Sequence, residues 1–426
     1  MEQQWYLLPQ TRKGVAVDLY VRNLYLDKIR GFYNADDIIK VITGVRRSGK
    51  SSIMELAAQE IRAAGTPPEH IIFLDLEKRP LRKIRTADAL EALIEEHAPS
   101  SPGMTYLFID EVQNVTGFED VLNGFRDEGG WSIFITGSNS YLLSGEIMTK
   151  LTGRYLEFEV MPLSFDEYEG MKAFYGKVIN ANPLVELDTY LREGGFPRAV
   201  LLDGEADKRA YVKGVVEEIF EKDIRRRVKI RDRAAFETVR QFVINNYGAP
   251  ASLNSIHAAL VGGGMRISKA SVSRYIGALV DAKILYECPR FDMKSKKAIR
   301  GEKKYYLADL GFYMAINVDN RLNYGPSLEN IVFTYAKAHG YEASVGRIGK
   351  LECDFILRAP DGDYAYVQVA YTISQSKATE DREYRPLETI KDNYPRYVIT
   401  TDYLLQRRNG IEHANLMDFM MAGREF

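Results

Sequence analysis

The chain of 426 residues has little cysteine, no long apolar run and no basic leader. Its two cysteines, Cys288 and Cys353, lack the close spacing of a zinc site and have no reason to pair in a reducing compartment. No run approaches the roughly 18 apolar residues of a membrane span, and the opening MEQQWYLLPQ lacks the basic-then-apolar order of a signal peptide. We therefore expect a cytoplasmic protein that does not enter a membrane, with both cysteines in its core.

An excess of charge of either sign is also absent. The 57 Lys and Arg residues nearly balance the 59 Asp and Glu residues, so that the formal net charge is −2. This balance excludes a chain that binds polyanions over its whole surface, and any contact with nucleic acid must come from a local basic patch. The hydrophobic content of 46% is that of a globular protein. The length allows about two to four domains, each with its own core.

The clearest motif is GVRRSGKS, which begins at Gly44 and fits the pattern G-x-x-x-x-G-K-[ST]. An apolar run precedes it and apolar residues at helical spacing follow it, which predicts a strand, a loop and a helix in this order. Backbone N–H groups of such a loop and the positive end of the helix bind phosphate, the lysine reaches the terminal phosphates, and the serine hydroxyl completes a magnesium shell. The predicted phosphate-binding residues are Gly44, Val45, Arg46, Arg47, Ser48, Gly49, Lys50, Ser51 and Ser52.

A second motif, TYLFIDEVQN, supplies carboxylates. Its apolar run ends in Asp110 and Glu111, as expected for a buried parallel strand that delivers acid groups to the carboxyl edge of an open α/β sheet. We expect Asp110 to hold Mg²⁺ together with Ser51, and Glu111 to orient or deprotonate the water that attacks the γ-phosphate. The two motifs together predict a site for ATP and Mg²⁺.

Two further predicted strands contribute candidate site residues. WSIFITGSNS is expected to be a strand ending in polar residues, which places Ser138 or Asn139 at the same sheet edge as Asp110. Either residue would sense the γ-phosphate or the attacking water, or the pair would simply cap the next helix. YLEFEV alternates like a fifth strand and follows Arg154. Arg154 is either a surface charge or a finger that reaches the γ-phosphate of a neighbouring subunit.

Taken in order, GVRRSGKSS, FIDEVQN, TGSNSYLLS, LTGRY and MPLSFDEY resemble the prokaryotic AAA+ ATPases of the archaeal-type clade that carry a C-terminal domain of undefined function. The resemblance implies a five-stranded parallel sheet with helices on both faces. It also implies that Arg154 is the trans-acting finger, and therefore that the protein is a homo-oligomer. On this basis we expect residues 1–165 to form the AAA+ P-loop core.

Residues 166–230 are predicted to be helical, as an AAA+ lid requires. Within them GGFPRAV matches the G-x-P element of related switch ATPases, and Arg198 directly after it resembles a lid arginine that contacts ATP. The alternative is that Pro197 merely begins a helix, which requires no nucleotide. Both interpretations stay open.

Residues 231–315 have the order of a winged helix-turn-helix, with helical segments followed by two β-like runs around a basic loop. The polar face of the predicted recognition helix includes Lys269 and Arg274. The loop from Arg290 to Lys304 has seven basic and two acidic residues, which fits phosphate contacts at a wing. Binding of double-stranded DNA through residues 268–304 is one interpretation, and docking of a partner protein is the other.

The last segment, residues 322–426, has the order helix, strand, turn, strand, with Glu329 on the helix and Asp354 on the first strand. It resembles the PD-(D/E)xK nuclease fold. The E-x-K triplet of that fold would fall on Gln368-Val369-Ala370, which lacks both the carboxylate and the lysine. We expect this domain to have lost nuclease activity.

A rescued metal site is the alternative. It would need Glu329 or Glu352 in the metal shell, and Lys350 or Lys377 in place of the missing lysine. The sequence as a whole predicts an α/β ATPase that hydrolyses ATP to ADP and phosphate to drive conformational change, with DNA as its target. A slow nucleotide-gated switch that acts through protein partners and an ATP-dependent nuclease remain as alternatives.

Overall fold

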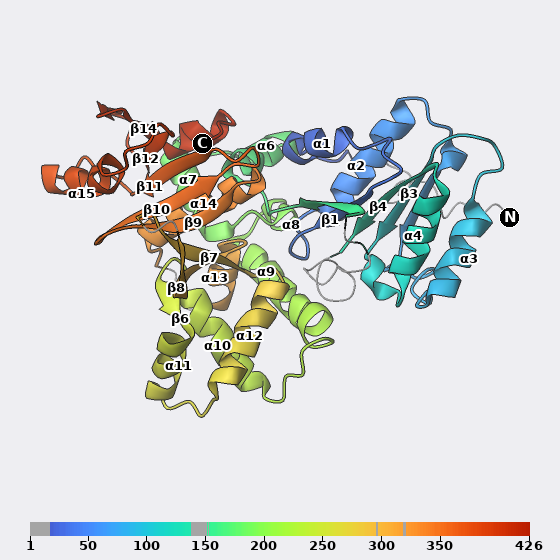
Figure 1. Ribbon diagram of the computed structural model, residues 1–426, viewed down its shortest axis with the longest axis horizontal. Coiled ribbons are helices and arrows are strands. Elements are labelled where there is room, and N and C mark those ends of the chain that lie inside the picture. The colour runs from blue at the N-terminus through green and yellow to red at the C-terminus, as the bar shows by residue number, and fades with distance from the viewer. Residues whose placement is uncertain (1–17, 138–150, 152, 295–296, 318–320) are drawn as a thin grey trace. The chain divides into compact units, whose positions relative to one another are not determined.

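The computed structural model describes residues 18–137, 151, 153–294, 297–317 and 321–426, and the side chains of residues 297–300 are not among the described parts. The predicted sensor residues Ser138 and Asn139 lie outside the described residues. The chain divides into two compact units, residues 1–160 and residues 161–426. Figure 1 shows the elements of each unit.

The first unit contains a five-stranded parallel sheet. In spatial order its strands are β2 (Ile71–Asp75), β3 (Thr105–Asp110), β4 (Trp131–Thr136), β1 (Ile39–Thr43) and β5 (Tyr155–Glu159). Parallel neighbours require crossover connections, which are α2 (Lys50–Ala63), α3 (Ala87–His97) and α4 (Phe118–Glu128) in the described part of the chain. The predicted α/β fold with a five-stranded parallel core is confirmed.

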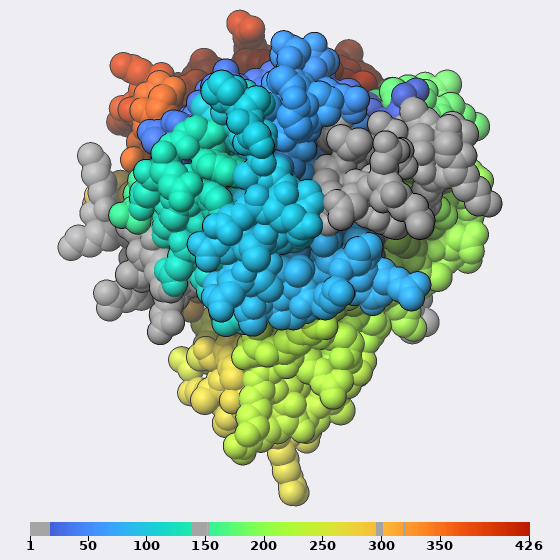
Figure 2. Space-filling model, turned by 90° about the vertical axis from the view of Figure 1, so that its right-hand side faces the viewer, coloured from blue at the N-terminus to red at the C-terminus, as the bar shows by residue number. Residues whose placement is uncertain are grey.

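Helices cover both faces of this sheet. Alternate strand residues such as Val41, Leu107 and Ile135 pack with apolar side chains of α3 and α4 in one buried cluster. On the other face, the rings of Phe108 and Phe134 stack with centroids 4.7 Å apart, and α2 crosses β3 and β4. Figure 2 faces the side of this unit where α3 and the connection between β2 and α3 form the surface. Burial on both faces explains why β2 and β3 are nearly continuous apolar runs, whereas the edge strand β5 alternates.

Helix α1 (Asn23–Arg30) precedes the sheet in the chain and packs against α2 and β5. Its apolar side is formed by Tyr25, Leu26 and Ile29, which are buried. This spacing is that of one helical face. The helix therefore belongs to the first unit, beside the loop between β1 and α2.

The second unit begins with helices, as predicted for residues 166–230. They are α6 (Phe165–Phe174), α7 (Pro183–Glu193), α8 (Pro197–Val200) and α9 (Glu205–Ile219), followed by a π-helical turn (Phe220–Ile224) and α10 (Arg233–Asn245). Local signals set several of their starts. Ser164 and Glu167 form a capping box at α6, and Asn182 accepts from the Leu184 N–H before the proline that begins α7.

A nine-stranded sheet forms the rest of this unit, in the order β13-β14-β12-β11-β10-β9-β7-β8-β6. Its strands are β6 (Pro250–Ser252), β7 (Leu285–Asp292), β8 (Lys297–Leu307), β9 (Glu342–Ile348), β10 (Leu351–Arg358), β11 (Tyr364–Val369), β12 (Arg396–Thr400), β13 (Arg407–Arg408) and β14 (Ile411–Asn415). The helices are α11 (Leu253–Gly262), α12 (Lys269–Asp281), α13 (Gly311–Ile316), α14 (Tyr324–Ala338), α15 (Lys377–Glu388) and α16 (Leu416–Met421).

One strand pairing joins the two predicted C-terminal domains. Strand β7 of the hairpin that was predicted as a wing pairs in parallel with β9, with Phe291 opposite Gly346. The hairpin β7–β8 and the C-terminal strands are therefore one continuous sheet. The assignments as winged helix and nuclease-like domain, and the boundary between them, stay predictions.

Two compositional expectations can be checked in the described residues. Cys288 and Cys353 are both free and buried, as predicted. Among the described helices none combines the length and the apolar character that crossing a membrane requires.

Candidate nucleotide site

The loop between β1 and α2 has a shape that requires glycine at its two ends. Gly44 has φ +139°, and a Cβ there would lie 2.2 Å from the carbonyl oxygen of Val160. Gly49 has φ +104° in the left-handed region and immediately precedes α2. Because α2 begins at Lys50, its first N–H groups, which have no acceptor within the helix, lie next to the loop, where they favour an anion.

The interior of this loop fits a phosphate group. Lys50 is 4% exposed, and its ammonium donates to the carbonyl oxygens of Gly44 (3.0 Å) and Val45 (3.1 Å). The buried hydroxyl of Ser48 has no hydrogen-bond partner among the residues that the structure describes. Arg22 steadies the same turn, since its guanidinium donates to the Ser48 carbonyl oxygen at 2.9 Å. A lysine that closes on its own loop and an unsatisfied hydroxyl are donors that phosphate oxygens would satisfy.

Asp110 ends β3 beside this loop. The hydroxyl of Thr136, at the end of β4, donates to its Oδ1. Burial raises the pKa of Asp110, while hydrogen bonds from Thr136 and Ser51 and the charge of Lys50 lower it. The structure thus brings together Ser51, Lys50 and Asp110, as predicted from two separate motifs. A hydroxyl and a carboxylate are hard oxygen ligands, so Ser51 and Asp110 suit Mg²⁺.

Glu111 follows in an unusual backbone conformation, with φ +59° and ψ +47°. Its N–H donates to Oγ1 of Thr136 at 3.0 Å, and its side chain accepts from Nε2 of Gln113. The guanidinium NH2 of Arg46 lies 3.5 Å from Glu111 Oε2. Burial raises the pKa of Glu111, and the charges of Arg46 and Lys50 oppose that change.

Sequence reasoning missed Thr136 and Glu55. Thr136 touches both members of the carboxylate pair, and the signal was present, because it is the polar residue that ends an apolar strand. Glu55 lies on α2 one turn after Ser51. Burial raises the pKa of Glu55 to about 7, and the charges of Asp110 and Asp75 add to that rise. The register of β2 and β3 places Asp75 directly beside Asp110 at this edge.

Comparison with known proteins agrees with this geometry. Residues 36–169 match a family described as an AAA domain, and residues 184–322 match a domain of unknown function (DUF8612). An uncharacterized protein of Haemophilus influenzae is 34% identical over 403 residues, which cover 94% of this chain and 98% of that protein. The chain belongs to the family of this Haemophilus protein.

The chain is also similar to an uncharacterized protein of Methanocaldococcus jannaschii. The two are 29% identical over 365 residues, which cover 83% of this chain and 79% of that protein. Among solved structures, the Orc1 protein of Aeropyrum pernix in complex with DNA has 16% identity and a TM-score of 0.32, covering 72% of this chain and 95% of that one. These last values are too low to transfer any property. The assignment of an AAA domain therefore depends on the family match over residues 36–169.

Within the AAA domain, Arg154 lies far from the phosphate-binding loop of its own chain. It is exposed and directly precedes β5. Tyr155 pairs with Ile39, the first residue of β1, whereas the loop follows the last residue of that strand. Five residues at about 3.3 Å each separate the two edges by about 16 Å. This geometry disfavours a contact between Arg154 and a nucleotide bound in the same chain.

Arg198 belongs to the second unit, where it is exposed in α8. The segment before it is fixed by Asp309, a residue that sequence reasoning missed. The Asp309 carboxylate accepts from the N–H groups of Gly195 (2.6 Å) and Gly311 (2.8 Å), and burial raises its pKa to about 7. A Cβ on Gly194 would lie 1.9 Å from Asp309 Oδ1, so this position needs glycine. The contact of Arg198 with ATP stays a prediction.

The carboxylates of the C-terminal segment lie close to Lys304, a lysine that was predicted to belong to the DNA-binding wing. Lys304 was expected to contact DNA phosphates at the wing, but it is 4% exposed. Its Nζ lies 2.9 Å from Glu329, 3.2 Å from Glu352 and 3.9 Å from Asp354. That expectation is corrected, because strand β8 turns Lys304 inward toward α14 and β10. Glu352 and Asp354, two residues apart on β10, both face Lys304.

These carboxylates line a cavity of about 560 Å³, to which Lys350 and Ala370 also contribute. The Gln368 amide donates to Glu383 at 3.0 Å and accepts from the Asp354 N–H at 3.3 Å, so it is engaged in local hydrogen bonds. Among the described residues, His, Cys, Asp and Glu side chains do not form a group of three that could hold a metal ion.

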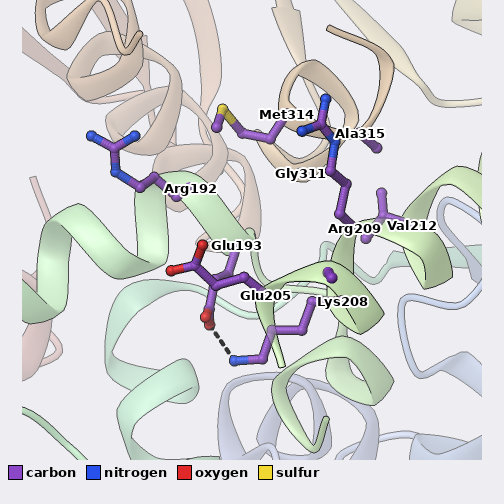
Figure 3. A pocket seen from close by; sticks show the side chains of 10 residues that line it. Arg192, Glu193, Glu205, Lys208, Arg209, Val212, Gly311, Met314 and Ala315 are labelled. Carbon is purple, nitrogen blue, oxygen red and sulfur yellow. Dashed lines mark hydrogen bonds and ion pairs between the residues drawn. The ribbon is translucent and has the colours of Figure 1, made fainter. Parts of the chain in front are cut away.

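A smaller cavity of about 310 Å³ lies among α7, α9 and α13 (Figure 3). Three cations of its wall have hydrogen-bond partners. Lys208 donates to Glu193 at 2.6 Å, and Arg192 donates to Asp188 at 2.8 Å. The Arg209 guanidinium donates to the carbonyl oxygen of Asn317. The three cations of this cavity are therefore already engaged in contacts within the protein.

Proposed function

We propose that this chain is a Mg²⁺-dependent ATPase that hydrolyses ATP to ADP and phosphate. The observation that carries this proposal is the meeting of Lys50, Ser51 and the Asp110-Glu111 pair at one edge of the parallel sheet. Open α/β sheets bind ligands at this edge. The match of residues 36–169 to an AAA domain supports it. The cytoplasm, where ATP is abundant, is the proposed location.

Each residue has a defined task in this proposal. The loop N–H groups and the start of α2 bind the phosphates, and Lys50 exchanges the carbonyls of Gly44 and Val45 for phosphate oxygens. Ser51 and Asp110 would hold Mg²⁺, which neutralises charge on the β- and γ-phosphates when bound. Glu111 takes the proton of the attacking water.

Thr136 has a supporting task, because its hydroxyl contacts the side chain of Asp110 and the main chain of Glu111. It fixes the metal ligand and the base relative to one another. A shift of about 1 Å between such groups is enough to lower a rate strongly. In this proposal Thr136, the last residue of β4, is a positioning residue. The sensor role of Ser138 or Asn139 stays a separate prediction.

Arg154 acts in trans in this proposal, and the protein is a homo-oligomer. The support is the strand register, which places Arg154 at the sheet edge opposite its own phosphate-binding loop. A guanidinium that stabilises charge on the transferring phosphoryl group must come within contact distance of it. The nucleotide that Arg154 contacts would therefore be bound by a neighbouring subunit.

DNA is the proposed target of the conformational change. The support is the exposed polar face of α12, with Lys269, Ser273 and Arg274, together with the basic hairpin β7–β8. A slow nucleotide-gated switch that acts through protein partners is the second candidate, because exposed basic helices also dock acidic protein surfaces. The inward position of Lys304 supports a C-terminal domain without nuclease activity.

Steady-state ATPase assays with and without duplex DNA test the proposal. We expect magnesium-dependent turnover that DNA stimulates, loss of nucleotide binding in Lys50→Ala, and ATP that is bound but not hydrolysed in Glu111→Gln. The reason is that Lys50 meets ground-state phosphate charge, whereas Glu111 acts on water in the transition state. Parental turnover by Glu111→Gln would move the base to Asp75 or Glu77. Slow turnover that DNA does not change would favour the switch.

A further inference from the structure

The phosphate-binding loop carries a second buried cation besides Lys50. The side chain of Arg46 is 6% exposed, its NH2 lies 3.5 Å from Glu111 Oε2, and its NH1 donates to Glu77 Oε1 at 3.4 Å. The adjacent Arg47 is exposed. One guanidinium of an anion-binding loop is therefore directed at the carboxylate that we propose as the catalytic base.

Glu111 is restrained on several sides in this arrangement. Gln113 donates to the same Oε2 that faces Arg46, and Thr136 accepts from the Glu111 N–H. The left-handed backbone of Glu111 is uncommon for a residue with a Cβ and persists only when its surroundings hold it. Donors around a carboxylate stabilise its ionised form, and they make it a weaker base toward water.

We propose that Arg46 is a positioning residue that pairs with Glu111 in the nucleotide-free protein and moves to the terminal phosphate of bound ATP. The move frees the Glu111 carboxylate for the attacking water. This inference rests on the proposed ATPase function. It adds a residue that makes the base competent only when a γ-phosphate is present.

Competition between two anions is the physical basis of the exchange. The planar guanidinium forms bidentate contacts with phosphate as well as with carboxylate, and a terminal phosphate carries more charge than one carboxylate. The distances of 3.4 and 3.5 Å show that Arg46 makes long contacts with Glu77 and Glu111, which a closer phosphate can replace. ADP lacks the terminal phosphate, so ADP leaves the Arg46–Glu111 pair in place.

Reciprocity gives the inference a binding test. If ATP must take Arg46 away from Glu111, removal of the Glu111 charge strengthens ATP binding, and it does so only while Arg46 is present. The pair Arg46→Gln and Glu111→Gln is therefore non-additive for ATP and without effect for ADP. A purely structural role of Arg46 in the loop predicts equal losses for both nucleotides.

The affinities of the full-length protein for ADP and for an ATP analogue with a non-hydrolysable β–γ methylene bridge are measured with Mg²⁺ for the parent, both single variants and the double variant. We expect Glu111→Gln to bind the analogue about five- to tenfold more tightly, with ADP affinity unchanged. Arg46→Gln should bind the analogue about tenfold more weakly and abolish that gain. Arg46→Lys should recover part of the loss, because it restores the charge without the planar fork. Arg62→Gln, an exposed charge later in α2, is the matched control.

Parallel losses for ADP and the analogue, or additive effects in the double variant, would overturn the inference. Nucleotide binding by Lys50→Ala at parental affinity would instead overturn the proposed function itself.

Discussion

Each unit of this protein contains a cluster of carboxylates with at least one buried member close to a lysine, and the charges of the two clusters are balanced in different ways. In the first unit, neutral hydroxyls of Thr136 and Ser51 bind Asp110, while the Lys50 ammonium donates to main-chain carbonyls. In the second unit, the Lys304 ammonium lies among Glu329, Glu352 and Asp354. The first lysine can be redirected to a ligand, whereas the second is already used by the protein.

The pKa shifts have the same contrast. Burial raises the pKa of both Asp110 and Asp354, and the adjacent Glu329 raises the pKa of Asp354 further. Burial lowers the pKa of Lys304, but its three carboxylates together raise it above its ordinary value. A carboxylate that accepts only from neutral hydroxyls keeps its negative charge uncompensated and can bind a cation from solution. A carboxylate beside a fixed ammonium has its charge compensated within the protein.

The largest effect expected in the first unit is that of Arg154→Ala. Turnover should fall by about 10³-fold or more with little change in ATP affinity, because a finger stabilises charge that develops only in the transition state. Steady-state kinetics and nucleotide titration measure the two quantities. Mixed assemblies of Arg154→Ala and Lys50→Ala subunits should regain activity. No recovery in an assembly shown by mass to be mixed would contradict the trans arrangement.

In the second unit, Lys304→Met should destabilise the fold by about 3–5 kcal/mol, because it leaves the buried Asp354 carboxylate and the neighbouring Glu329 without the Lys304 ammonium. Chemical unfolding of the variant measures the loss. Lys303→Met is the matched control, since Lys303 is more exposed and pairs with Glu287 at 2.7 Å. The control should cost about 1 kcal/mol or less. Equal stability of the two variants would show that Lys304 is not the internal cation described above.

A smaller effect should follow removal of charge from the hairpin. Replacing Lys294 and Lys297 by alanine should lower the slope of log affinity for duplex DNA against log salt by about 0.9 for each lost phosphate contact. Replacing the exposed Lys377 and Lys391 removes equal charge elsewhere and should leave the slope unchanged. If the hairpin variant behaves like this control, the hairpin β7–β8 is a protein-docking surface instead of a DNA-binding one.

No effect at all is expected from Mg²⁺ or Mn²⁺ at the cavity of the second unit. The intact protein should not cleave single- or double-stranded DNA or RNA, with or without ATP, because Gln368 and Ala370 supply neither a second carboxylate nor a lysine. Gel analysis of labelled substrates is the measurement. Cleavage that Asp354→Ala abolishes would mean that Lys304 supports a displaced active site, and the contrast between the two units would fail.

Local pattern was enough to predict much of the first unit. The apolar runs of β1 and β3, the glycines that bound the phosphate-binding loop and the acids that end β3 are all set by residues adjacent in the chain. Buried parallel strands and a loop at a helix start impose those residue types locally. That is why the parallel sheet was predicted correctly from the sequence.

Contacts between residues distant in the chain depended on the tertiary structure. A threonine that ends a strand, an arginine within a loop and a lysine in a basic hairpin have the same local pattern whether they face solvent or a carboxylate. Strand register brings Thr136 to Asp110, loop conformation turns Arg46 to Glu111, and the pairing of β7 with β9 joins the hairpin to the sheet that bears Asp354. The sequence determined which charges are present, and packing decided which of them neutralise one another, because that depends on distances of a few ångströms between separate elements.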